Sequence, residues 1–338
     1  MTLRIVVAVA LAGAVAIGGV QVRTNGALYP WFRFDGAMNS FMLMGAELDV
    51  QATVTSATRD LFSVALQLNA GTAMPGWTSS FHFGEAYAVI PLGLSRPSVR
   101  VGQAVIPFGL MADYDVHNQI IQTSFARTVG LRLDAGIGIL GTLGPTGYWL
   151  QVSNGSGPFA MDGDRDKVIT TRIAPTFLAG DAELTVGLSG LVGVLPYWPM
   201  DSLPRMADGP TAFARKFRLG LDNTTDWGPV TLRLEGVAGR DSSLAGPAGF
   251  GYYAEARWAL GWPVELIAKY DGWHQQEAGA WRSARSLGLG TTLRLPELTG
   301  LDLQVVYDHE FGKIGGHGGH GGNDGQDWSA STQLTVLF

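Results

Sequence analysis

Few side chains in this sequence have the types and spacing that catalysis or metal binding requires. The stretch "GGHGGHGG" carries His317 and His320, two imidazoles that could bind zinc, copper or nickel weakly. Ordering so many glycines costs conformational entropy, so we favour a flexible polar loop without a resident metal. Cysteine is absent, which excludes disulfides, thiolate metal sites and cysteine nucleophiles.

Two further motif matches lie in expected strands, where they cannot form the sites that the motifs usually mark. "GIGILG", at 136–141, has the letters of the dinucleotide fingerprint, but it lies inside an expected strand with no helix after it. In "YDHEF", His309 stands between Asp308 and Glu310, yet strand alternation points the imidazole away from both carboxylates. The G-x-S-x-G motif of hydrolases is missing. We therefore predict no enzyme and no cofactor.

The charged residues that remain fall on one face of predicted strands. In "VTLRLEG", at 230–236, apolar side chains alternate with Thr231, Arg233 and Glu235, a period of two. The polar row of all predicted strands carries the charged candidates Glu47, Asp49, Arg100, Arg132, Asp134, Arg172, Glu183, Arg218, Arg233, Glu235, Glu255, Arg257, Lys269, Asp271, Arg294 and Asp302. Both signs occur, which predicts a wet channel without a strong ion filter. The alternative is that these charges pair and simply hold the wall together.

The same alternation recurs along the whole chain after residue 18. We expect about sixteen strands near 22–35, 43–55, 59–71, 80–91, 97–107, 128–141, 146–154, 167–178, 181–195, 212–223, 229–239, 249–260, 263–275, 283–295, 300–312 and 326–338. Short connections such as "SATR" and "LAGD" alternate strictly with long ones such as "GTAMPGWTSS". Short turns at one end and long loops at the other are the layout of a transmembrane antiparallel up-and-down β-barrel.

Composition agrees with a membrane barrel. Charged residues make up 15% of the chain, against about 25% in soluble domains. Residues 1–18 have a basic start, a short apolar run and a small-residue cleavage pattern, so we predict a signal peptide followed by one barrel domain over 19–338. The formal net charge of −6 argues against nucleic acid as a partner.

Aromatic residues gather near predicted strand ends. Trp227, Trp262, Trp273 and Trp328 would form girdles at the two lipid–water boundaries. The last predicted strand ends on Phe338, and its "TVLF" resembles the C-terminal assembly signal of outer-membrane barrels.

One segment has a more specific resemblance. "VRVGQAVIPFGLMADYDV", with Gly102, Pro107, Phe108 and Gly109, resembles the strand and "PFG" corner of the phosphate-selective (O/P) porins. That resemblance implies a trimer of 16-stranded barrels, each with its own pore. The chain has 23 basic and 29 acidic residues, so it lacks the basic pore rows of that family. We therefore carry over the architecture and not the phosphate selectivity.

The third long connection, 108–127, is too apolar to stay in water and too long for a simple hairpin. We expect it to fold inward and to set the narrowest point of the lumen. The predicted constriction residues are Asp113, Asp115, His117, Arg127, Arg100, Arg132 and Asp134, with the acidic loop residues facing the basic wall. The alternative is an outward loop that packs on a neighbouring subunit.

These patterns together predict an outer-membrane porin of a Gram-negative-type bacterium, a channel for passive diffusion of small hydrophilic solutes or ions. Its expected partners are the outer-membrane lipid bilayer, two copies of itself in a homotrimer, and the solutes or ions that cross. Two alternatives stay open. The barrel could be a sleeve for a partner such as a cytochrome, without an inward loop, or an enzyme with histidine and acidic groups at one rim.

Overall fold

The computed structural model describes residues 19–34, 39–56, 59–71, 80–93, 97–113, 128–157, 165–196, 213–242, 248–261, 263–277, 279–295, 301–311 and 328–337. Its strands are β1 (Gly19–Phe34), β2 (Asn39–Thr55), β3 (Asp60–Gly71), β4 (Ser80–Pro91), β5 (Ser98–Val105), β6 (Leu133–Leu143), β7 (Thr146–Ser153), β8 (Val168–Ala179), β9 (Ala182–Pro196), β10 (Phe213–Trp227), β11 (Val230–Asp241), β12 (Ala248–Gly261), β13 (Val264–Glu277), β14 (Ala280–Leu295), β15 (Leu301–Phe311) and β16 (Trp328–Leu337). A short 3₁₀-helix, η2 (Gly109–Asp113), follows β5.

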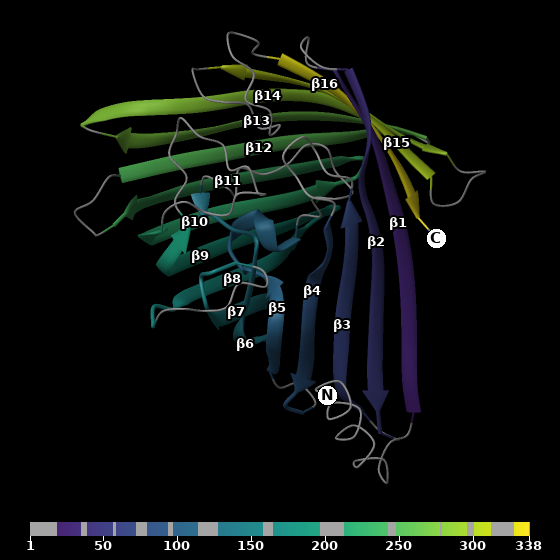
Figure 1. The fold of residues 1–338 in the computed structure, drawn as a ribbon, viewed down its shortest axis with the longest axis vertical. Coiled ribbons are helices and arrows are strands. Elements are labelled where there is room, and N and C mark those ends of the chain that lie inside the picture. The colour runs from purple at the N-terminus through teal and green to yellow at the C-terminus, as the bar shows by residue number, and fades with distance from the viewer. Residues whose placement is uncertain are drawn as a thin grey trace.

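These strands form one closed antiparallel barrel in which each strand pairs with its neighbours in sequence (Figure 1). The seam is closed by β1 and β16, whose register joins Ala27 to Leu337 and Phe34 to Ala330. Closure pairs the edges that an open sheet would leave free, which a lipid environment requires. The predicted all-β barrel of about sixteen strands is confirmed. In the described part of the chain, no helix has the length and apolar character needed to cross a membrane.

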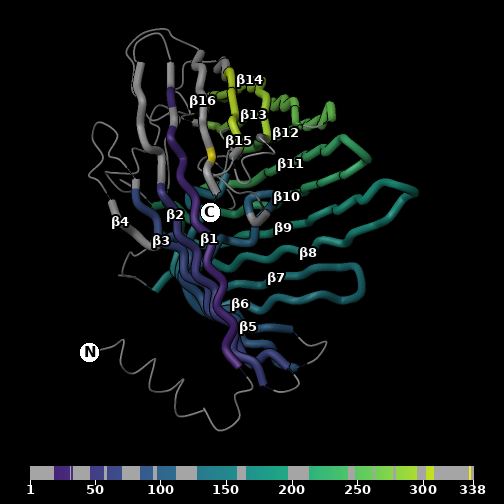
Figure 2. Tube along the Cα trace, turned by 90° about the vertical axis from the view of Figure 1, so that its right-hand side faces the viewer, coloured from purple at the N-terminus to yellow at the C-terminus, as the bar shows by residue number. Residues whose placement is uncertain are grey.

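The predicted pattern of connections is correct at one end of the barrel and only partly correct at the other. Figure 2 shows neighbouring strands from β6 to β11 joined in pairs by tight turns at one end. At the long-connection end, however, β13 and β14 are separated only by residues 278–279, and β1 and β2 only by 35–38. Strict alternation is therefore wrong. Gln276, Glu277 and Arg282 made the stretch 276–282 look like a loop, whereas β13 continues to Glu277 and β14 begins at Ala280.

Strand alternation sorts side chains between lipid and lumen. On β10, Lys216, Arg218 and Asp222 point inward and are buried, whereas Leu219 and Leu221 point outward and are exposed. Trp227 and Trp258 are outward and exposed near the tight turns, and Trp281 lies outward at the long-connection end. Such rings favour the boundary between lipid and water.

The girdle prediction is wrong for Trp273, which is 1% exposed and belongs to the inward row of β13. Its indole nitrogen donates to Gln275 at 3.1 Å, and the Arg218 guanidinium stacks over the ring at 5.5 Å. The parity of β13 decides this placement, because Lys269 and Asp271 share its buried face. Trp262, Phe338, residues 1–18, His317 and His320 lie outside the described residues, as does the side chain of Trp328.

Candidate functional site

The chain that follows β5 turns into the barrel instead of staying at its rim. We call residues 106–113 the inward segment. The Gly109 amide donates to the Ser189 hydroxyl on β9 at 3.0 Å, and the Leu110 amide donates to the Glu235 carboxylate on β11. Gly109 has a φ of +56°, and a Cβ there would collide with the Glu235 carboxylate, so the close approach requires glycine.

Apolar contacts hold the inward segment, which follows β5, against the inner face of β8–β11. Phe108 is buried, and its ring lies over Gly220 on β10, where a Cβ would come within 2.9 Å of it. The buried cluster between the segment and the wall consists of Val105, Ile106, Phe108, Met111, Val129, Leu131, Val168, Leu191, Leu195 and Val237. The inward segment therefore reaches from the end of β5 to the inner face of β8–β11, and the predicted inward direction of the loop is confirmed for its described part, 108–113.

The returning end of the connection, 128–132, is held by two cations from β10. Arg218 Nε donates to the Thr128 carbonyl at 2.6 Å, and Lys216 Nζ donates to the Val129 carbonyl at 3.0 Å. Arg218 also forms an ion pair with Asp241 at 2.5 Å. These bonds explain why β6 begins at 133 and not at the predicted 128, since residues 128–132 have left the wall.

A buried ion pair lies in the same wall. Arg172 on β8 and Asp222 on β10 meet at 2.6 Å, and their side chains are 2% and 1% exposed. The Arg172 guanidinium also stacks over Trp149 at 5.7 Å, and both charges act electrostatically on Glu235. A paired, hydrogen-bonded charge tolerates burial that a lone charge would not. The pair therefore lies beside Glu235, the carboxylate that accepts the Leu110 amide of the inward segment.

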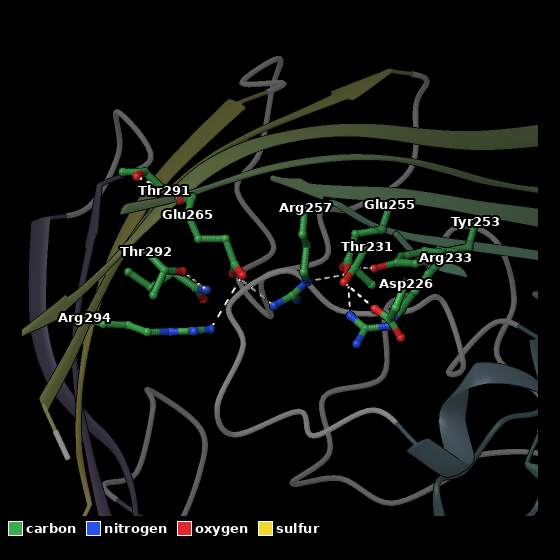
Figure 3. Close-up of polar contacts among 11 residues, drawn as sticks. Asp226, Thr231, Arg233, Tyr253, Glu255, Arg257, Glu265, Thr291, Thr292 and Arg294 are labelled. Atoms are coloured by element: carbon green, nitrogen blue, oxygen red, sulfur yellow. Dashed lines mark hydrogen bonds and ion pairs between the residues drawn. The ribbon is translucent and has the colours of Figure 1, made fainter. Parts of the chain in front are cut away.

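A second group of charges begins beside the inward segment and runs away from it (Figure 3). We call Arg233, Glu255, Arg257, Glu265 and Arg294 the arginine–glutamate ladder. Glu255 bridges Arg233 and Arg257 at 2.7 and 2.6 Å and accepts a bond from the Tyr253 hydroxyl at 2.5 Å. Glu265 then links Arg257 and Arg294, each at 3.5 Å.

The ladder crosses four strands, β11 to β14, and its two ends, Arg233 and Arg294, are more exposed than the residues between them. The Glu255 carboxylate is fully buried, whereas the Arg294 side chain is 54% exposed. Because Glu235 contacts the inward segment and Arg233 lies two residues farther along β11, the ladder starts at the edge of the narrowed region.

The described members of the predicted constriction have different hydrogen-bond partners. Arg100 donates to the Val105 carbonyl at 3.1 Å and to Gln151 at 2.7 Å, so it supports the start of the inward segment. Asp134 is fully buried and accepts bonds from the Gly155 and Gly157 amides. The Arg132 carbonyl accepts from the Ile106 amide at 2.9 Å.

The rest of the predicted constriction cannot be placed. Asp115, His117 and Arg127 lie outside the described residues, as does the side chain of Asp113. The facing of acidic loop and basic wall therefore stays a prediction.

Sequence reasoning missed several charges of the inner wall. Lys216 and Asp222 follow the same alternation on β10 as Arg218, so the period of two was a sufficient signal for them. Asp241 and Glu265 lie near the ends of their strands, where the alternation is weakest.

Comparison with known proteins identifies the fold. No protein-family model and no curated protein matches the sequence. Solved structures do match over nearly the whole chain. In-vitro folded OmpT, an outer membrane protein of Vibrio cholerae in its trimer form, has a TM-score of 0.68 at 12% identity, covering 95% of this chain and 100% of its own. This is the fold of an outer-membrane β-barrel.

Two further porin-type structures support that conclusion. An anion-selective porin from Comamonas acidovorans has a TM-score of 0.65 at 13% identity, covering 95% of this chain and 100% of the porin. The outer membrane channel DcaP of Acinetobacter baumannii has a TM-score of 0.64 at 11% identity, covering 95% and 98%. The predicted outer-membrane location agrees with these structures. The finer resemblance to phosphate-selective porins stays a prediction.

Proposed function

We propose that this protein is an outer-membrane porin, a water-filled channel for passive diffusion of small hydrophilic solutes or ions. The observation that carries the proposal is the connection between β5 and β6, whose described ends, 106–113 and 128–132, are both anchored to the inner wall on one side of a polar lumen. A fixed narrowing beside an open, charged wall suits a passage that limits solute size. By analogy with the trimer form of OmpT, we also propose a homotrimer.

The pairing of the wall charges supports weak ion selectivity. Arg172, Arg218 and Arg233 each have a carboxylate partner within ion-pair distance. A paired charge presents a small net field to a passing ion, so neither sign is strongly excluded. The ladder has three arginines and two glutamates, which supports a slight preference for anions along that wall.

The inward segment also favours a channel over a sleeve for a protein partner. A protein partner in the lumen would have to displace a segment whose apolar side chains are buried against β8–β11. The enzyme alternative would require a reacting group, and the described inner wall uses its charged side chains mainly to hold one another and the backbone.

Conductance of the purified, refolded protein in planar lipid bilayers tests the proposal. We expect discrete current steps, a conductance that rises nearly in proportion to salt concentration, and a small reversal potential in a salt gradient. A protein that inserts and is heat-modifiable on gels but passes no current would overturn the channel and favour the sleeve or the enzyme.

A further inference from the structure

Four polar side chains gather on the outer surface of the barrel, on the face opposite the lumen. They are Tyr252 on β12, Tyr270 and His274 on β13, and Arg285 on β14. Strand parity fixes their direction. On β13 the odd residues Lys269 and Asp271 are buried inside, so the even residues face outward. This surface lies outside the channel described above.

The cluster is built around a glycine. Tyr252, Gly272 and Arg285 lie in one row across three strands, joined by the register pairs Tyr252–Gly272 and Gly272–Arg285. The Tyr252 ring lies down over Gly272, where a Cβ would come within 2.6 Å of the phenol oxygen. Any larger residue at this position would lift the ring away from the sheet.

Because the ring lies flat, its hydroxyl reaches the other members of the cluster. The Tyr252 and Tyr270 hydroxyls are 3.4 Å apart, and the Tyr252 ring centre is 5.9 Å from that of His274. The Arg285 guanidinium is close enough to act electrostatically on both Tyr252 and His274. Two hydroxyls, an imidazole and a guanidinium can all donate hydrogen bonds to one group between them.

Among the described residues, Arg285 differs from the paired arginines of the lumen, because no described carboxylate lies beside it. Arg172, Arg218, Arg233 and Arg257 each have a carboxylate within ion-pair distance. In the described part of the chain, no carboxylate is found at that distance from Arg285. A charge on the lipid face of a barrel is destabilising, most of all at mid-depth, so an anion from outside would stabilise it.

The surroundings place the cluster near the lipid–water boundary on the long-connection side. Toward the tight turns, the outward row of β13 continues with the exposed apolar residues Ala268 and Leu266. Toward the long connections lie Phe250, stacked on His274 at 4.5 Å, and Trp281, 5.6 Å from Phe250. Aromatic rings of this kind mark headgroup level.

We propose that Tyr252, Tyr270, His274 and Arg285 form an outward-facing site for the phosphate of an anionic lipid in the leaflet on the long-connection side. The proposal rests on the membrane location given under Proposed function. Arg285 supplies the charge and up to two parallel donors, the tyrosine hydroxyls and the imidazole complete the set of donors, and Phe250 and Trp281 pack on the lipid beneath its headgroup.

Native mass spectrometry of the full-length protein in detergent tests this site, with phosphatidic acid as the probe and phosphatidylcholine as the neutral reference. Wild-type protein should retain phosphatidic acid preferentially. Arg285→Gln should lower that retention about tenfold, which corresponds to about 1.4 kcal/mol. Tyr252→Phe should lower it less, because the charge remains, and Arg285→Lys should be intermediate, because the paired donors are lost.

Arg215→Gln is the matched control. Arg215 is another exposed outward-facing arginine, but it already lies 3.3 Å from Asp166, so its loss should leave lipid retention unchanged. Equal retention by wild type and Arg285→Gln would overturn the site, as would displacement of the lipid by millimolar inorganic phosphate, or a change of oligomeric state in Arg285→Gln. Since Arg285 is outside the lumen, the variant should still conduct. Loss of lipid with normal conductance therefore separates this proposal from the channel itself.

Discussion

The two halves of the described inner wall differ in how deeply their charged side chains are buried. On β8–β11, Arg172 and Arg218 are buried with their carboxylate partners, and Arg218 also holds the returning end of the connection at Thr128. On β11–β14, the ladder ends in Arg294, whose side chain is half exposed and 3.5 Å from Glu265. The first arrangement is closed to water, and the second opens to water at Arg294. A charge in a lumen is therefore not by itself evidence of a role in transport.

The largest effect should come from breaking the buried pair. Arg172→Met leaves Asp222 buried near Glu235 without its counter-ion, so the free energy of unfolding should fall by about 3–5 kcal/mol. Urea titration in lipid vesicles, followed by tryptophan fluorescence, measures the change. The double variant Arg172→Met with Asp222→Leu should recover most of the loss, because no charge is then left alone. A single variant as stable as wild type would show that water reaches this pair.

A smaller effect, on selectivity more than on stability, should follow from Glu265→Gln. The substitution keeps the shape of the side chain but removes the negative charge that joins Arg257 to Arg294. The reversal potential in a salt gradient should shift toward anions. Glu183→Gln, on the inward row of β9 and more exposed to water, is the comparison, and its shift should be smaller because salt screens exposed charges more. Equal shifts would mean that the ladder has no special position.

Arg294→Gln should have the smallest effect. An exposed ion pair at 3.5 Å contributes little, so the free energy of unfolding should change by no more than about 0.5 kcal/mol. The reversal potential should move slightly toward cations, opposite to the shift of Glu265→Gln. A loss of stability comparable to that of Arg172→Met would contradict the division between a structural and an open half.

Sequence alone was sufficient for the barrel, because each strand carries its own alternation and needs no partner to reveal it. Segments such as 230–241 and 248–261 appear within two residues of their predicted bounds. The apolar residues of the third long connection were also sufficient for its direction. Phe108 and Leu110 can be buried only where water is excluded, and the wall of β8–β11 provides that place.

The pairing of charges could not be predicted, because it depends on register between strands. Glu255 meets Arg233 through the hydrogen-bonded alignment of β11 with β12, which no single strand encodes. Asp134 looked like a lumen residue from its parity, yet amides of a distant loop, at Gly155 and Gly157, surround its carboxylate. Such a contact is visible only once the chain has folded back on itself.

The seam between β1 and β16 has a consequence for the order of assembly. Every other strand pairing joins neighbours in sequence, so hairpins can form one after another along the chain. Only the pairing of Ala27 with Leu337 and its neighbours unites opposite ends of the polypeptide. Closing so long a loop has a high entropic barrier and is slow. Until it closes, β1 exposes unpaired amides and carbonyls. We therefore expect closure to be the last pairing to form, and a chain shortened by its final strand should remain an open sheet.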